Sequence, residues 1–163
     1  MNKFLPIAIA AILFGEASAQ EDQDRSIYFL VENMEVAWTT KDASRFAMNF
    51  SDDHDYIVWN GMYSPNITVE ANKNGHEFLF SEMEAKTHVK YVVDKISYLN
   101  EDIALVHILG CTFKKENQPL PYPTQIQTWV LRNEGNQWKI KSLHSTDIEY
   151  DVFIHQQDCL DTP

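Results

Sequence analysis

The stretch that decides the fold is residues 102–146, which contains DIALVHILG (102–110), QIQTWVLR (125–132) and QWKIKSLHST (137–146). Each segment is rich in β-branched and aromatic residues and has the length of a strand. The turn sequence Asn-Glu-Gly-Asn at 133–136 joins the last two segments, and a charged, proline-containing loop at 114–123 separates the first two. We therefore predict three long antiparallel strands joined in sequence order.

The residues before this stretch predict helices and shorter strands. Apolar residues at helical spacing indicate a helix over 27–39, and Asp42 is the expected N-cap of a second helix over 43–50. Residues 51–55 read as a turn, and residues 56–59 as a strand ending at a hairpin turn, Asn60-Gly61. A third helix is expected over 65–85 and a strand over 86–99. Helices followed by a sheet indicate an α+β domain with helices packed on one face of a curved antiparallel sheet.

The N-terminus has the pattern of a secretory signal peptide. A basic start is followed by an apolar run over 4–14 and by the small residues Ala17-Ser18-Ala19. The run is too short for a transmembrane helix, and a buried N-terminal helix is the alternative. We therefore predict a signal peptide at 1–19, a domain at 20–149 and a C-terminal tail at 150–163, in a protein exported to the periplasm or the extracellular space.

Composition limits the partners. The formal net charge is −11, with 24 acidic and 13 basic residues, and no basic stripe is present. Nucleic acid and anionic membranes are therefore unexpected partners. The two cysteines, Cys111 and Cys159, could form a disulfide in an export compartment, or could remain two free thiols.

Three histidines are the candidate catalytic residues. His76 shares a helical face with Leu79 and Phe80, so it should point toward the sheet. His107 and His144 lie on strands among apolar neighbours, where burial should lower the pKa of His107 and leave it neutral. For His76 and His107, a buried structural role is the alternative to chemistry.

Two further pairs of residues are candidate ligand contacts. Gln127 and Trp129 share one face of the middle strand, and amides beside an aromatic ring suit a small, partly polar ligand. Trp59 and Tyr63 flank the Asn60-Gly61 turn and could form the rim of a pocket. No metal-ligand spacing, phosphate loop or nucleophile elbow is present, so neither a metal nor a cofactor is expected.

Taken together in their order and spacing, several fragments resemble the nuclear transport factor 2-like superfamily, nearest to its SgcJ/EcaC branch beside the SnoaL-like domains. The fragments are Ala37-Trp38, Asp42, Phe46-Ala47, residues 53–58, Gly61, Gly75-His76, Leu79-Phe80, residues 102–107, Gly110, residues 128–131, Gly135, residues 138–140 and residues 144–146. The resemblance implies a cystatin-like α+β barrel: three N-terminal helices packed on a curved antiparallel sheet, forming a cone. It further implies a ligand site inside the cone and frequent homodimers formed through the sheet.

The chain departs from the ketosteroid isomerases of this superfamily. The places of their tyrosine, their first aspartate and their second acid fall near Met34, near Val58 or Trp59, and near Gln127. Both acids are missing, so steroid isomerisation of that kind is not expected.

These observations leave three functions open. The first is an exported, homodimeric domain that binds a small apolar or aromatic molecule. The second is a cofactor-free acid–base enzyme, an isomerase, cyclase or dehydratase, that uses pocket histidines. The third is a protein-interaction domain with a filled cone.

Overall fold

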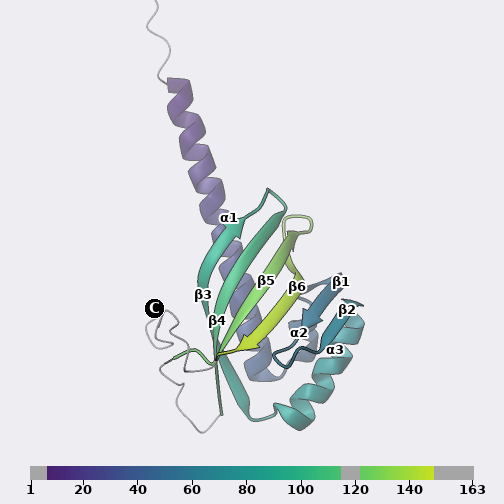
Figure 1. The fold of residues 1–163 in the computed structure, drawn as a ribbon. Helices are drawn as coiled ribbons and strands as arrows, with labels where there is room; N and C mark the ends of the chain where they lie inside the picture. The colour runs from purple at the N-terminus through teal and green to yellow at the C-terminus, as the bar shows by residue number, and fades with distance from the viewer. Residues whose placement is uncertain (1–6, 115–121, 149–163) are drawn as a thin grey trace, which may run out of the picture.

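The computed structural model describes residues 7–114 and 122–148, and side chains from residue 20 onward. It opens with a long helix, α1 (Ile7–Thr40), which projects beyond the rest of the domain at its N-terminal end (Figure 1). Its buried stripe contains Ile27, Leu30, Val31 and Met34, each at most 5% exposed. The helix predicted over 27–39 is therefore confirmed, and it continues back through much of the predicted signal peptide. No helix among the described residues is long and apolar enough to cross a membrane.

The second helix is shorter than predicted. α2 (Ala43–Ala47) begins as expected at Asp42, whose side chain accepts a hydrogen bond from the backbone N–H of Arg45 at 2.8 Å. Phe50, which we assigned to this helix, is instead the first residue of β1 (Phe50–Ile57). The turn predicted over 51–55 was wrong, because these residues form the middle of that strand.

The acidic residues of β1 have partners: Asp52 and Asp55 accept backbone N–H groups, and Asp53 lies beside basic side chains. Asp53 forms ion pairs with Arg132 at 3.0 Å and with Lys141 at 2.8 Å. Gly61, with φ of +83°, then turns the chain into β2 (Tyr63–Ile67), which confirms the hairpin. The third helix was predicted to begin at residue 65, but β2 occupies residues 63–67.

The third helix begins after β2. α3 (Val69–Phe78) is capped by Thr68, and it ends in a π-helical turn, η1 (Leu79–Met83). Its buried face contains Asn72, His76 and, in η1, Phe80. His76 and Phe80 lie on this face, as predicted from the sequence, and Leu79 beside them is partly buried.

The remaining strands follow the predicted order. They are β3 (Thr87–Tyr98), β4 (Ile103–Lys114), β5 (Gln125–Asn133) and β6 (Trp138–Asp147). The six strands are ordered β2-β1-β6-β5-β4-β3 in one sheet. The sheet is mixed rather than purely antiparallel, because β1 pairs with β6 in parallel, and it does not close into a barrel. The α+β class and the curved sheet are confirmed, although α3 follows two strands rather than preceding the sheet.

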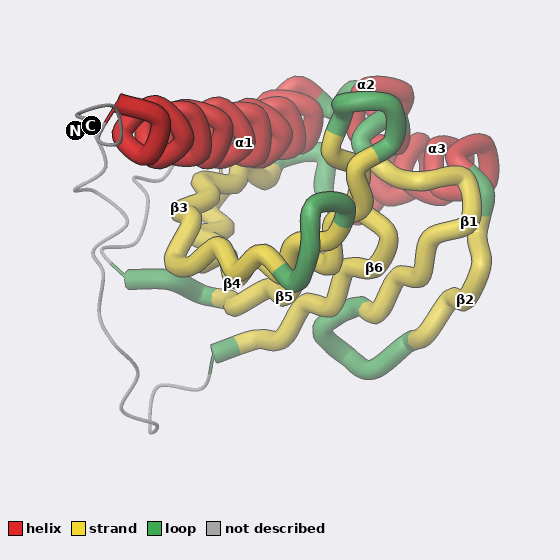
Figure 2. Tube along the Cα trace, turned by 90° about the horizontal axis from the view of Figure 1, so that it is seen from above, coloured by secondary structure: helices red, strands yellow, loops and turns green. Residues whose placement is uncertain are grey.

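All three α-helices lie on one side of the sheet, which we call its inner face (Figure 2). On β4 the inner face consists of Ala104, Val106 and Ile108, each 0% exposed. Because side chains alternate along a strand, His107 lies on the opposite, outer face together with Leu105. The prediction that His107 points into the interior was therefore wrong.

Candidate functional site

A chain of side-chain hydrogen bonds crosses the inner face of β5. The indole N–H of Trp129 donates to Oε1 of Gln127 at 2.8 Å, and Nε2 of Gln127 donates to Oε1 of Gln125 at 2.9 Å. Ser145 on β6 donates to the same Gln125 oxygen at 2.8 Å. Gln127 is also a hydrogen-bond partner of the Tyr91 phenol on β3. Three strands therefore place neutral polar groups on a wall that is otherwise apolar.

Gly110 on β4 makes room for this chain. A Cβ atom at Gly110 would lie only 2.7 Å from Cγ of Gln125, closer than real Cβ contacts allow. The Gln125 side chain therefore lies over the Gly110 backbone, from where its Nε2 donates to Thr112 at 2.9 Å.

His54 on β1 and Asn72 on α3 form a second buried pair. Nδ1 of His54 lies 2.6 Å from the carbonyl oxygen of Ser51, which can only accept, so Nδ1 carries the ring proton. Desolvation lowers the pKa of His54, which keeps the ring neutral. Its Nε2 then accepts from Nδ2 of Asn72 at 2.7 Å. Oδ1 of Asn72 is buried and has no hydrogen-bond partner among the described residues.

His76 lies one helical turn after Asn72 on the same face of α3. Its Nδ1 donates to the backbone carbonyl of Asn72 at 3.0 Å, so the Nε2 atom is an acceptor, and no described residue donates to it. The ring packs at a centroid distance of 4.0 Å against Phe46 and of 5.8 Å against Tyr56. Asn72 and His76 therefore present two neighbouring acceptors without donors.

The titratable groups of this interior are uncharged at neutral pH. Burial lowers the pKa of His76 from 6.5 to about 4, with the nearby His54 contributing in the same direction. Burial raises the pKa of the Tyr56 and Tyr91 phenols above the ordinary value. The nearby Tyr91 raises the pKa of Tyr56 further, and the nearby Glu35 raises that of Tyr91. We call the side chains of Tyr56, Asn72, His76, Tyr91 and Gln127 the inner cluster.

The predicted site residues divide between the two faces of the sheet and the surface. His76, Gln127 and Trp129 lie in the interior, as expected. His107 and His144 both lie on the outer face, and His144 is exposed. Thr128 on β5 lies between them, paired with His107 on β4 and with His144 on β6. The three candidate histidines therefore do not share one site: His76 lies inside, and His107 and His144 lie on the outer face.

Trp59 and Tyr63 lie at the surface of the β1–β2 hairpin. They are 64% and 56% exposed, so neither packs into the interior. His54 and Asn72, by contrast, were not predicted as site residues. His54 was missed because its segment read as a turn.

Only one of the two cysteines lies among the described residues. Cys111 on β4 is 0% exposed and is not a free thiol. Cys159 lies outside the described residues, so the pairing of the two stays a prediction. Within 7–114 and 122–148, no group of three or more His, Cys, Asp or Glu side chains is placed to hold a metal ion.

Comparison with known proteins identifies the fold. No protein-family model matches the sequence, and no curated protein sequence matches it. A domain of unknown function with a cystatin-like fold from Nostoc punctiforme PCC 73102 superposes with a TM-score of 0.70 at 18% identity, over 78% of this chain and 79% of that one.

Two further solved structures support the same assignment. A nuclear transport factor 2-like protein of unknown function from Shewanella oneidensis MR-1 superposes with a TM-score of 0.64 at 17% identity, over 77% of this chain and 99% of that one. A ketosteroid isomerase-like protein from Erwinia carotovora atroseptica gives a TM-score of 0.57 at 12% identity, over 77% and 95% of the two chains. At these identities the likeness shows the fold alone: the chain is an α+β domain with the cystatin-like fold of nuclear transport factor 2-like proteins.

Proposed function

We propose that this chain is an exported domain that binds a small molecule inside the cone, between α3 and the inner face of β5. The observation that carries the proposal is the pair of acceptors on α3, Oδ1 of Asn72 and Nε2 of His76, which no described residue supplies with a donor. Of the two, Oδ1 of Asn72 is buried, and leaving a buried acceptor unsatisfied costs about 1–3 kcal/mol. A ligand that donates a hydrogen bond to this pair would recover that free energy on binding.

The surroundings of the pair favour a neutral, largely apolar ligand. The inner cluster carries no charge at neutral pH, and aromatic rings surround His76 on several sides. Placing an ion in such a setting would cost several kcal/mol without a charged partner. A phenol or an alcohol with an aromatic or alicyclic body fits these requirements.

Binding is better supported than acid–base catalysis. A general base works best when its pKa lies near the working pH, and the pKa of His76 is about 4. Val58, Trp59 and Gln127 stand near the places where ketosteroid isomerases of this superfamily carry acids. Membership of the SgcJ/EcaC branch stays a prediction.

A matched set of probes tests the proposal. We expect 2-naphthol to bind the full chain more tightly than 2-methylnaphthalene, which has no donor, and than 2-naphthoate, which is charged. One neutral hydrogen bond is worth about 1 kcal/mol, so the expected advantage over 2-methylnaphthalene is about fivefold. Calorimetry gives the affinities, and the indole N–H resonance of Trp129 reports binding at the inner face.

Two variants locate the contact. His76→Phe keeps the ring stacking but removes the acceptor, so it should abolish most of the preference for 2-naphthol. His144→Phe makes the same change on the outer face and should leave all three affinities unchanged. Equal binding of 2-naphthol and 2-methylnaphthalene to the unaltered chain would contradict the proposal, and no binding at all would favour a filled interaction domain.

We also propose that the mature chain is a homodimer that pairs through the outer face. Described helices cover only the inner face, and the outer face carries the partly exposed apolar side chains Leu105, Ile126 and Val130. After export, we expect an intact mass that corresponds to a chain beginning at Gln20, and a dimer in sedimentation at micromolar concentration. A monomer would overturn the dimer, and an uncleaved N-terminus would overturn the export.

A further inference from the structure

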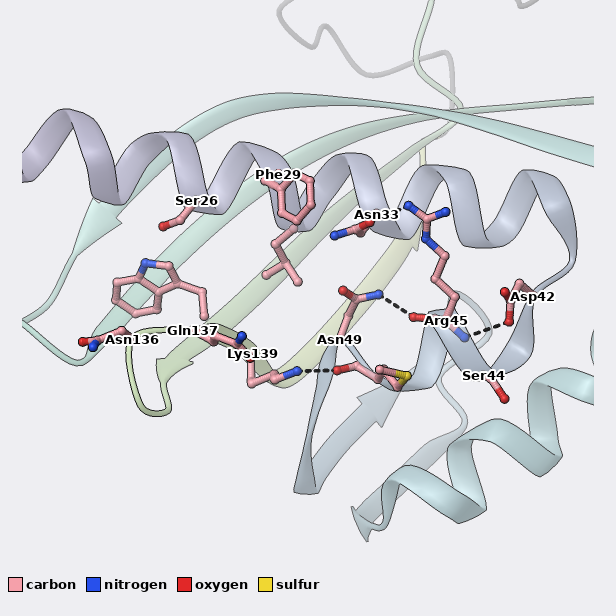
Figure 3. Close-up of a pocket in the computed structure, with 13 residues that line it drawn as sticks. Ser26, Phe29, Asn33, Asp42, Ser44, Arg45, Asn49, Asn136, Gln137 and Lys139 are labelled. Carbon is pink, nitrogen blue, oxygen red and sulfur yellow. Dashed lines mark hydrogen bonds between the residues drawn. The ribbon is translucent and has the colours of Figure 1, made fainter.

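A groove lies between α1, the α2 region and the start of β6 (Figure 3). Its volume is about 460 Å³, within the range of small-molecule sites. Three segments far apart in the sequence line it: residues 26–33, 42–49 and 136–139. It shares none of its lining residues with the inner cluster.

The groove has an apolar lining with one available donor. Leu30 and Trp138 are 5% and 6% exposed, while Phe29 and Met48 are 63% and 64% exposed. The indole N–H of Trp138 donates to no described residue, and solvent reaches this nitrogen although most of the side chain is buried. The N–H group is therefore available to a ligand in the groove that accepts a hydrogen bond.

Two cations line this groove without a carboxylate partner among the described residues. Arg45 donates to the amide oxygen of Asn33 at 2.6 Å, and Lys139 donates to the backbone carbonyl of Met48 at 2.6 Å (Figure 3). Neither forms an ion pair with a described residue. Several other described cations do, among them Arg25, Lys73, Lys90, Arg132 and Lys141.

Two cations without a carboxylate partner are unusual in a chain with a formal net charge of −11. The one carboxylate that lines the groove, Asp42, already accepts the backbone N–H of Arg45 as the cap of α2. The groove therefore combines two unneutralised cations and one free N–H donor with exposed apolar surface. Positive charge and apolar surface together complement an anion that carries an apolar tail.

We infer that this groove binds an amphipathic monoanion, a carboxylate on an unbranched or aromatic apolar body. The carboxylate pairs with Arg45 and Lys139, and the apolar body lies over Leu30 and Trp138 between Phe29 and Met48. The site is separate from the one proposed inside the cone, and its ligand is an anion rather than a neutral molecule. Either site can therefore fail without the other.

Decanoate tests the inference, with decanol as its uncharged match. We expect titration of the full chain with decanoate, below its critical micelle concentration, to shift the indole N–H resonance of Trp138, assigned with Trp138→Phe. Decanol should shift it far less at equal concentration. The Trp129 resonance serves as the internal control, because it reports the inner face rather than the groove.

Charge variants complete the test. Arg45→Gln combined with Lys139→Gln should weaken decanoate binding about tenfold, as expected for the loss of two partly exposed charge contacts. Arg25→Gln combined with Lys73→Gln removes the same amount of charge at residues that do not line the groove. This double variant should leave the affinity for decanoate unchanged. The inference is overturned if decanol shifts Trp138 as strongly as decanoate does, if decanoate shifts only Trp129, or if both double variants lose affinity equally.

Discussion

Replacing Trp129 with alanine is expected to lower the free energy of unfolding by about 3–5 kcal/mol, which is typical of removing a fully buried aromatic side chain. Trp129 is 0% exposed and lies at the centre of the sheet, where Val106 and Leu143 pair with it on the neighbouring strands. Its ring contacts Tyr91 at a centroid distance of 6.0 Å. The substitution also leaves Oε1 of Gln127 without its donor, which adds to the cost.

Urea denaturation followed by circular dichroism measures this change, and the chain offers a matched control. Trp59 is 64% exposed at the β1–β2 hairpin, so Trp59→Ala should change stability by less than about 0.5 kcal/mol. Comparable losses for both tryptophans would contradict the assignment of Trp129 to the interior and Trp59 to the surface.

Acidification is expected to destabilise the fold between pH 6.5 and pH 4. His76 has a pKa of about 4 in the folded state, below its ordinary value of 6.5, so in this range the unfolded chain binds a proton that the folded chain does not. The free energy of unfolding must then fall as the pH falls. Because one pKa unit is worth about 1.4 kcal/mol, His76 alone accounts for a loss of about 3 kcal/mol.

His54 adds to the same trend, since burial lowers its pKa as well. His76→Phe should remove most of the pH dependence in this range, whereas His144→Phe should not. Denaturation at a series of pH values between 4 and 7 gives the slopes. A His76→Phe variant as acid-sensitive as the unaltered chain would contradict the burial of a neutral His76.

The sequence predicted β3 to β6 well because these strands are long and rich in β-branched residues, and their ends differ from the prediction by a few residues at most. It missed most of β1 and all of β2. It could not determine which face of β4 points inward. Both Ala104-Val106-Ile108 and Leu105-His107-Leu109 read as apolar faces, so alternation alone left the direction of His107 undetermined. Only the position of the helices decides it.

His54, which contacts Asn72 of the inner cluster, was missed for a different reason. The acidic residues around His54 resemble a turn, and the register shift between His54 and Tyr56 disrupts the alternation that identifies a strand. The groove beside α1 had no sequence signal, because its three segments meet only in the folded chain. His76, by contrast, was placed correctly because helical spacing alone joins it to Phe80.

The most direct test of the central claim measures the imidazole ¹⁵N resonances of the full chain with and without 2-naphthol. If the ligand donates its hydroxyl to the inner cluster, the resonance of His76 Nε2 should shift on binding, while those of His107 and His144 stay where they are. A titration in which 2-naphthol binds but the His76 resonance does not move, or in which only the outer-face histidines respond, would contradict a ligand site inside the cone.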